Sequence, residues 1–175
     1  YYGVEHLFLD LRKIFTYSNC SLLKQSTEKI PEESYAKQIS KTNGETPVST
    51  YVPFRNGLFL SSAASIALSK DCEVIYYGAH ADDSAGFAYP DCSPVFNRAM
   101  NEAIWEGSGH QLKIEAPFVN VSKAEVVRIG LELNVPYELT WSCYEGGEKP
   151  CGKCGTCIDR AAAFQANHVE DPALQ

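Results

Sequence analysis

Apolar and polar residues alternate along this chain in blocks that predict strands and helices in turn. Residues 4–11 are dense in large apolar side chains and predict a short buried strand. Residues 57–68 place small residues between large apolar ones, which is typical of a helix packed closely on a sheet. The β-branched and aromatic run 73–78 predicts a central parallel strand, and residues 112–117 predict another strand.

Two further helices are predicted by the residues at their starts. Ser93 supplies an N-cap with a proline at the next position, and apolar residues then recur at helical spacing until Gly107. Ser122 and Glu125 have the spacing of a capping box, in which each side chain accepts from the other residue's backbone amide. The helix that follows is expected to end near Leu133, because Asn134 and a proline come next.

This alternation predicts an α/β fold with a Rossmann-like parallel sheet and helices on both faces. The 175 residues are enough for one globular core and too few for two full-sized domains, so we expect a single domain over 1–175. Residues 16–50 are polar and interrupted by proline and glycine, which predicts a long loop or lid.

Charge and hydropathy exclude two classes of partner. The net charge of −7 argues against a protein that coats a phosphate backbone, because that binding needs clustered Lys and Arg. No stretch approaches the roughly 18 apolar residues of a membrane span, and no secretory leader opens the chain. We therefore expect a cytoplasmic protein that binds neither nucleic acid nor membrane.

Four of the seven cysteines are crowded near the carboxyl terminus, within segment 143–157. Cys143 is followed by two overlapping Cys-x-x-Cys pairs made by Cys151, Cys154 and Cys157. Four thiolates suit a tetrahedral Zn²⁺ site whose full shell leaves no place for substrate, so we expect one structural zinc. A redox pair, an iron–sulfur cluster and chance clustering are the alternatives. Lys149, Lys153 and Arg160 could offset the charge of the thiolates.

Two cations lie at predicted helix starts. Lys123 falls in the first turn of its helix, where free backbone amides favour an anion such as phosphate. Arg55 follows a proline turn and could clamp phosphate or carboxylate, while Asn56 beside it could be an N-cap. Taken alone, each motif favours the ordinary interpretation, a solvent-facing side chain or a helix cap, over a ligand site.

A polar segment follows the predicted strand 73–78. It contains His80, Asp82 and Asp83, and Asp91 lies a little further on. Ligands of open α/β sheets bind at the carboxyl ends of the strands. Carboxylates there can hold Mg²⁺, recognise the donor edge of a purine-like ring or act as general bases, and the composition does not choose among these.

Taken in order, these motifs resemble the 7-cyano-7-deazaguanine synthases, the QueC family of preQ0 synthases in the PP-loop ATPase, or adenine nucleotide alpha hydrolase-like, superfamily. The matching segments are Tyr51-Val52-Pro53-Phe54-Arg55-Asn56, Gly78-Ala79-His80-Ala81-Asp82-Asp83, Tyr89-Pro90-Asp91-Cys92, Ser122-Lys123-Ala124-Glu125 and the four cysteines. The resemblance runs from Thr50 to Pro172 and is most specific at residues 89–92 and in the cysteine cluster.

The resemblance implies a ligase that converts 7-carboxy-7-deazaguanine to the nitrile with ATP and ammonia, in queuosine biosynthesis. It also implies one zinc, ATP as co-substrate with Mg²⁺, and a homodimer. We assign Arg55 and Lys123 to ATP binding and catalysis. We assign Asp83, Tyr89, Asp91 and Asn56 to recognition of the deazaguanine.

One expected element is absent from these 175 residues: they contain no Ser-Gly-Gly-x-Asp-Ser pyrophosphate loop. The resemblance places that loop, the first strand and the following helix before Tyr1, and without them we expect no catalysis. The rival hypotheses are another PP-loop enzyme, such as a tRNA thiolase or an amidating synthetase, and a non-catalytic zinc-ribbon module. The acidity disfavours a tRNA thiolase.

Overall fold

The computed structural model describes residues 2–174, and its centre is a pair of parallel strands. Strand β1 (Val74–Tyr76) pairs with β2 (Lys113–Glu115), with Ile75 opposite Ile114. Parallel strands need a long crossover, and residues 77–112 supply it with α3 (Ala81–Ser84) and α4 (Pro94–Gly107). This arrangement confirms the predicted α/β class, although the described residues contribute only two strands to the sheet.

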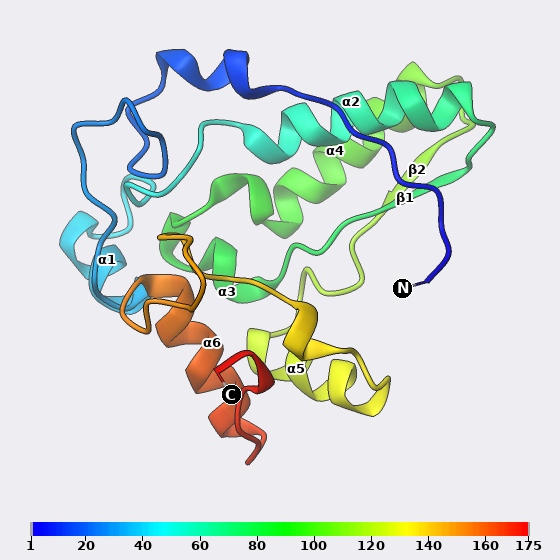
Figure 1. The fold of residues 1–175 in the computed structure, drawn as a ribbon. Coiled ribbons are helices and arrows are strands. Elements are labelled where there is room, and N and C mark those ends of the chain that lie inside the picture. Colours follow the sequence, from blue (N-terminus) through cyan, green and yellow to red (C-terminus); the bar gives the residue numbers. More distant parts are fainter. Residues whose placement is uncertain (1, 175) are drawn as a thin grey trace.

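Helices α2 (Arg55–Ser69) and α4 pack against the strands (Figure 1). Their shared core is formed by Leu60, Ile104, Leu112 and Ile114, all less than a tenth exposed. Leu112 is completely buried, so the start of β2 is anchored beneath both helices. Burial of such side chains contributes about 1.5–3 kcal/mol each, which makes this cluster a main source of stability for the sheet layer.

The predicted helix starts are confirmed, with one difference. Ser93 Oγ accepts from the amide of Phe96 at 3.1 Å, as an N-cap does. At the start of α5 (Lys123–Glu132), Ser122 Oγ accepts from the amide of Glu125 at 3.2 Å. The Glu125 carboxylate pairs with Arg128 at 2.7 Å instead of reaching back to Ser122, so only half of the capping box forms.

A second layer is formed by α5 and α6 (Gly155–Ala166), which lie side by side below the strands in Figure 1. Val127 of α5 packs on Ala163 and Phe164 of α6. Two short 3-10 turns complete this layer, η4 (Tyr137–Leu139) and η5 (Pro172–Leu174). The Tyr137 ring meets Phe164 edge to face at 5.0 Å. This layer therefore joins the carboxyl-terminal helix to the region after β2.

The predicted strand at residues 4–11 is wrong. In the structure these residues have no regular secondary structure, and Val4 is 77% and Phe8 82% exposed. A strand is stable only when its backbone groups are paired. Among residues 2–174, neither β1 nor β2 pairs with residues 4–11. The segment is tethered near its start by an ion pair between Glu5 and Lys70 at 2.8 Å.

The region predicted as a loop, 16–50, contains more structure than expected. The 3-10 helix η1 (Arg12–Tyr17) enters it, and α1 (Tyr35–Thr42) lies inside it. Ser34 caps α1 by accepting from the amide of Lys37, and Asn43 ends it in the left-handed conformation. Tyr35 and Gln38 are buried, so the apolar face of α1 is covered by the rest of the molecule.

Two further 3-10 turns, η2 (Ala85–Phe87) and η3 (Pro90–Cys92), follow α3.

Within residues 2–174, no helix combines the length and the hydropathy that crossing a bilayer would need.

Candidate functional site

The four clustered cysteines converge on one point. The Sγ atoms of Cys143, Cys151, Cys154 and Cys157 all lie within 4.8 Å of one another, and every one of these residues is buried or half-buried. Four thiolates bound to Zn²⁺ at about 2.3 Å would lie about 3.8 Å apart, so a small contraction would bring them to tetrahedral coordination. The cluster therefore fits a metal ion.

The local backbone supports this geometry. The amide of Cys151 points at the Cys143 sulfur and the amide of Cys154 at the Cys151 sulfur, both at 3.3 Å. Gly152 has φ +73°, a left-handed conformation that glycine adopts at little cost and that turns the chain between two of the cysteines. Cys154 is the N-cap of α6, so its thiolate also lies at the positive end of a helix.

Ionisation of these thiols is favoured at one position in particular. Burial raises the pKa of the Cys154 thiol, but the Thr156 hydroxyl and nearby backbone amides outweigh that effect and lower it to about 6.

The cations expected to offset the negative charge of the thiolates are only partly available. Lys153 pairs with Glu32, and Arg160 pairs with Asp171 at 2.6 Å, so two of the three neutralise carboxylates.

A second group of polar residues gathers where α2 begins. Asp91 in η3 is buried, and its Oδ2 accepts from the backbone amide of Asn56 at 2.9 Å. The side-chain amide of Asn56 donates to the Asp91 carbonyl and to the Cys92 sulfur, both at 3.1 Å. Burial raises the pKa of Asp91, an effect that the Asn56 amide and the charge of Arg55 counteract. Asn56 is thus the second residue of α2 rather than its N-cap.

Helix α3 connects this group to a second cation. The Asp83 carboxylate of α3 lies 3.3 Å from Nε2 of His80. Burial lowers the pKa of the His80 imidazole. The buried Nδ1 atom of His80 has no hydrogen-bond partner among residues 2–174. The neighbouring Asp82 accepts from the backbone amide of Lys123 at 2.8 Å, across to the start of α5. The two predicted cations thus lie in different surroundings, with Arg55 near Asp91 and Lys123 near Asp82.

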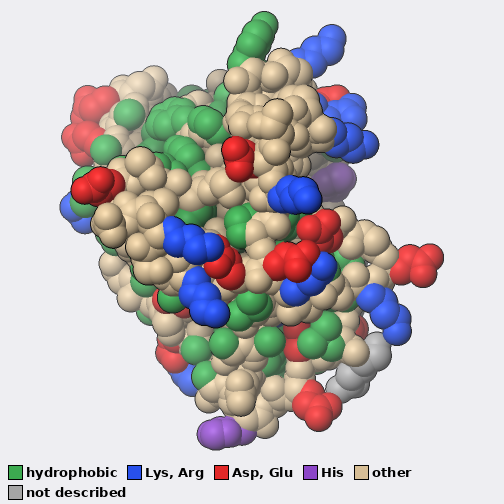
Figure 2. All heavy atoms as spheres, turned by 90° about the vertical axis from the view of Figure 1, so that its left-hand side faces the viewer, with side chains coloured by type: hydrophobic (Ala, Val, Ile, Leu, Met, Phe, Trp, Pro, Cys, Tyr) green, Lys and Arg blue, Asp and Glu red, His purple; other side chains and the backbone are tan. Residues whose placement is uncertain are grey.

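Beside α3 is an open groove of about 400 Å³ between α1, α5 and α6. Its polar wall is formed by Ser34, Asp82, Lys123 and Asp159. Burial raises the pKa of Asp159, and Lys123 counteracts this. Figure 2 shows the side of the molecule to which α1 belongs, where cationic and anionic side chains are interspersed. The groove could accept a ligand with an anionic part next to Lys123 and hydrogen-bond donors next to the carboxylates.

Tyr89 lies in the core rather than at the surface. Its side chain is 6% exposed, and its hydroxyl contacts those of Tyr35 at 2.9 Å, Tyr144 at 3.2 Å and Thr50 at 2.5 Å. Burial raises the pKa of both Tyr35 and Tyr89 well above the usual range, so these phenols stay protonated. The role in deazaguanine recognition assigned to Tyr89 from the sequence stays a prediction, and in this structure its ring packs against protein.

The comparison with known proteins bears directly on this arrangement. A family model described as Queuosine biosynthesis protein QueC matches residues 1–168. The chain belongs to the QueC family. Proteins named 7-cyano-7-deazaguanine synthase are similar to it: that of Archaeoglobus fulgidus is 40% identical over 98% of this chain and 68% of its own length. Those of Caldicellulosiruptor saccharolyticus and Porphyromonas gingivalis are each 41% identical over 97% of this chain, covering 71% and 73% of their own lengths.

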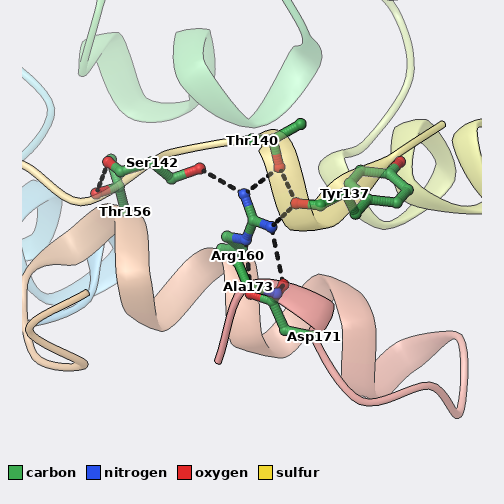
Figure 3. Close-up of polar contacts among 7 residues, drawn as sticks. All are labelled: Tyr137, Thr140, Ser142, Thr156, Arg160, Asp171 and Ala173. Atoms are coloured by element: carbon green, nitrogen blue, oxygen red, sulfur yellow. Dashed lines mark hydrogen bonds and ion pairs between the residues drawn. The ribbon is translucent and has the colours of Figure 1, made fainter. Parts of the chain in front are cut away.

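Within this QueC-family chain, sequence reasoning missed several residues that the site uses. Tyr35, Tyr144 and Asp159 stand in no motif, and only tertiary packing brings Tyr35 and Asp159 to the groove and Tyr35 and Tyr144 to the hydroxyl cluster. The sequence predicted for Arg160 only that it could offset the charge of the cysteine thiolates. Arg160 binds both oxygens of Asp171, at 2.6 and 2.8 Å, and also donates to Thr140, as Figure 3 shows. An Arg soon after the last cysteine and an Asp near the end of the chain gave no sequence signal for this pairing.

Proposed function

We propose that this protein is a 7-cyano-7-deazaguanine synthase, which converts 7-carboxy-7-deazaguanine, ammonia and ATP to the nitrile. The observation that carries the proposal is the hydrogen-bonded contact between Asn56 and Asp91, which joins two of the family-like motifs at the carboxyl end of β1. The family match and the relatives' names support the same reaction. They disfavour the rival hypotheses, a tRNA thiolase, an amidating synthetase or a zinc-ribbon module.

The chemistry requires activation of a poor electrophile. A carboxylate resists ammonia because it is anionic and lacks a leaving group, so ATP first converts it to a mixed anhydride, in our proposal an acyl-adenylate. Ammonia then attacks the carbonyl carbon and displaces the phosphate-linked oxygen, which gives the amide. A second activation of the amide oxygen lets that oxygen leave with phosphate, and loss of two protons from nitrogen yields the nitrile.

Arg55 and Lys123 are our candidates for stabilising the phosphate charge in both stages. Each stands at the first position of a helix, α2 and α5, where the free amides add to the positive potential. Lys123 lines the groove beside α3, which supports ATP binding there with Mg²⁺ held by neighbouring carboxylates. That placement of ATP and Mg²⁺ is part of the proposal.

Recognition of the deazaguanine is assigned to Asp83 and Asp91, with Asn56 and Tyr89 in support. A carboxylate can accept from the ring N1–H and the exocyclic amine together. The side-chain amide of Asn56 is already engaged with Asp91 and Cys92, so its proposed contribution is to hold Asp91 in place. A bound zinc would be held by Cys143, Cys151, Cys154 and Cys157 and would stabilise the segment that these residues form. The homodimer, the cytoplasmic location and the absence of nucleic-acid binding stay predictions.

The test combines anaerobic metal analysis with a nitrile-formation assay on the full-length protein, using 7-carboxy-7-deazaguanine, ATP and ammonia. We expect about one zinc per chain and a nitrile product that requires all three substrates. Zinc without any turnover would point to a related PP-loop enzyme or a binding module. No zinc would remove the structural role proposed for the four cysteines.

A further inference from the structure

We propose that Tyr144 is a positioning residue through which the four-cysteine metal site holds the turn that carries Asp91. The inference rests on the proposed function, because Asp91 and Asp83 are the carboxylates assigned there to the deazaguanine. It extends that function by coupling occupancy of the metal site to substrate binding. The metal site would then do more than stabilise its own segment.

The coupling element is a closed cluster of four hydroxyls from four separate segments. Tyr89 donates to Tyr35 at 2.9 Å, and Tyr35 donates to Tyr144 at 3.1 Å. The hydroxyls of Tyr144 and Tyr89 lie 3.2 Å apart, so the three tyrosine hydroxyls form a triangle of hydrogen bonds. The Thr50 hydroxyl lies 2.5 Å from that of Tyr89. Tyr35, Tyr89 and Thr50 are almost completely buried, so water cannot replace a missing partner.

The four hydroxyls of this cluster have as many protons as there are contacts among them. Each hydroxyl has one proton and two acceptor lone pairs. Because Tyr89 gives its proton to Tyr35, the contacts from Tyr144 and Thr50 must be donated to Tyr89. Four protons therefore fill four contacts, and Tyr89 accepts twice. Removing the Tyr144 hydroxyl breaks the triangle and leaves Tyr35 without its acceptor.

Tyr144 belongs to both sides of this connection. It follows Cys143 directly, and it packs both against the buried cysteines and against the core around Tyr35 and Tyr89. On the other side, the backbone amide of Tyr89 donates to the carbonyl of Asp83 at 3.0 Å. Asp91 lies two residues after Tyr89. Displacement of Tyr144 would therefore be transmitted to both carboxylates that the proposed function assigns to the substrate.

The first test compares Tyr144→Phe with Tyr137→Phe in the zinc-loaded, full-length protein. Tyr137 is a matched control because its partly buried hydroxyl also donates a hydrogen bond, to the Val127 carbonyl at 3.2 Å, outside the cluster. We expect Tyr144→Phe to raise the Kd for 7-carboxy-7-deazaguanine about three- to tenfold at unchanged zinc content, as suits the loss of one buried hydrogen bond. Tyr137→Phe should leave this Kd unchanged.

The second test measures the reciprocal effect, since coupling between two binding sites acts in both directions. Zinc is titrated to equilibrium against a competing chromophoric chelator, with and without 7-carboxy-7-deazaguanine. We expect the substrate to raise the affinity for zinc severalfold in the wild type and in Tyr137→Phe, but not in Tyr144→Phe. A role confined to folding would not make the zinc affinity depend on substrate.

A further variant keeps the inference testable if Tyr144→Phe loses zinc. Thr50→Val removes a hydroxyl that contacts Tyr89 and that belongs to a residue outside the cysteine cluster, and it should raise the same Kd while zinc is retained. An unchanged Kd in a zinc-loaded cluster variant, or equal effects of Tyr144→Phe and Tyr137→Phe, would overturn the inference. If the wild type does not bind 7-carboxy-7-deazaguanine at all, the proposed function fails instead.

Discussion

The backbone amide of Asn56 donates to the Asp91 carboxylate at 2.9 Å, and the side-chain amide of Asn56 donates to the Asp91 carbonyl at 3.1 Å. This double contact joins residues 35 positions apart in the sequence. It satisfies one of the free amides at the start of α2 and places a buried carboxylate against the positive end of that helix. The same contact that stabilises the fold therefore holds the acid proposed to recognise the substrate.

Replacing Asp91 with Asn should separate these two roles. The Asn oxygen can still accept from the Asn56 amide, so the fold should be retained, whereas the charge that accepts from the deazaguanine is lost. We expect the Kd for 7-carboxy-7-deazaguanine to rise about 10- to 100-fold, as suits one charge-assisted contact. Isothermal titration of the full-length protein measures this, with the exposed Asp71→Asn as control. An unaffected Kd would remove Asp91 from the recognition site.

The same substitution should change stability with pH. Burial makes the pKa of Asp91 higher in the folded protein than in the unfolded one. The stabilisation from its protonated form is present at low pH and is lost as the pH rises through the folded pKa. Asp91→Asn should therefore gain stability relative to the wild type as the pH rises from about 4 towards neutrality. Urea unfolding at several pH values would show this, and a constant difference would contradict it.

Lys123→Met should weaken ATP binding selectively. The variant keeps the long apolar stem but removes the charge beside Asp82 at the start of α5. We expect about a 10- to 100-fold higher Kd for ATP with little change in the Kd for 7-carboxy-7-deazaguanine. Lys113→Met, on β2, should affect neither ligand. Equal weakening of both ligands would instead indicate a general disturbance of the groove.

The metal prediction is tested by two cysteine substitutions. Cys143→Ser removes one of four sulfurs from a site that needs all of them, so we expect zinc to be lost to a chelator that the wild type resists. Cys72→Ser changes an exposed thiol outside the cluster and should retain about one zinc per chain. Metal analysis after dialysis against the chelator distinguishes the two. Equal zinc retention would contradict a four-sulfur site.

The pair of Arg160 and Asp171 should be a main stabiliser of the carboxyl-terminal layer. Their side chains are 11% and 4% exposed, so removing one partner leaves the charge of the other buried and unpaired. We expect Asp171→Asn to lower the free energy of unfolding by about 3 kcal/mol near neutral pH. Asp10→Asn, which breaks an exposed pair with Arg12, should have no measurable effect. Urea denaturation of the zinc-loaded protein checks both.

This pair should also respond to acid. Burial alone would raise the pKa of Asp171, but hydrogen bonds from Arg160 and the Ala173 amide outweigh it and lower the pKa. The resulting stabilisation is present above the unfolded pKa and is lost as the pH falls through the folded pKa. The stability difference between the wild type and Asp171→Asn should therefore shrink below about pH 4. A difference that persists in acid would mean that packing, not charge, stabilises the layer.

The local sequence determined the elements whose signals are short-range. Ser93 and Ser122 marked helix starts because an N-cap needs only a side-chain oxygen three residues before an amide. The spacing of the four cysteines predicted one metal centre, because close Cys-x-x-Cys turns bring thiolates together locally. Alternation of strand and helix likewise gave the α/β class, since each run of residues reports its own periodicity.

Only the tertiary structure decided which distant groups meet. Residues 4–11 have the composition of a strand, but a strand forms only when another backbone pairs with it. Tyr35, Tyr89 and Tyr144 come from segments far apart in sequence, and their shared hydroxyl cluster forms only when α1 packs against the segments that carry Tyr89 and Tyr144. The ion pair of Arg160 with Asp171 has the same origin. Helix caps and the turns between clustered cysteines depend only on residues close together in the sequence, whereas burial and charge pairing arise only when the whole chain has packed.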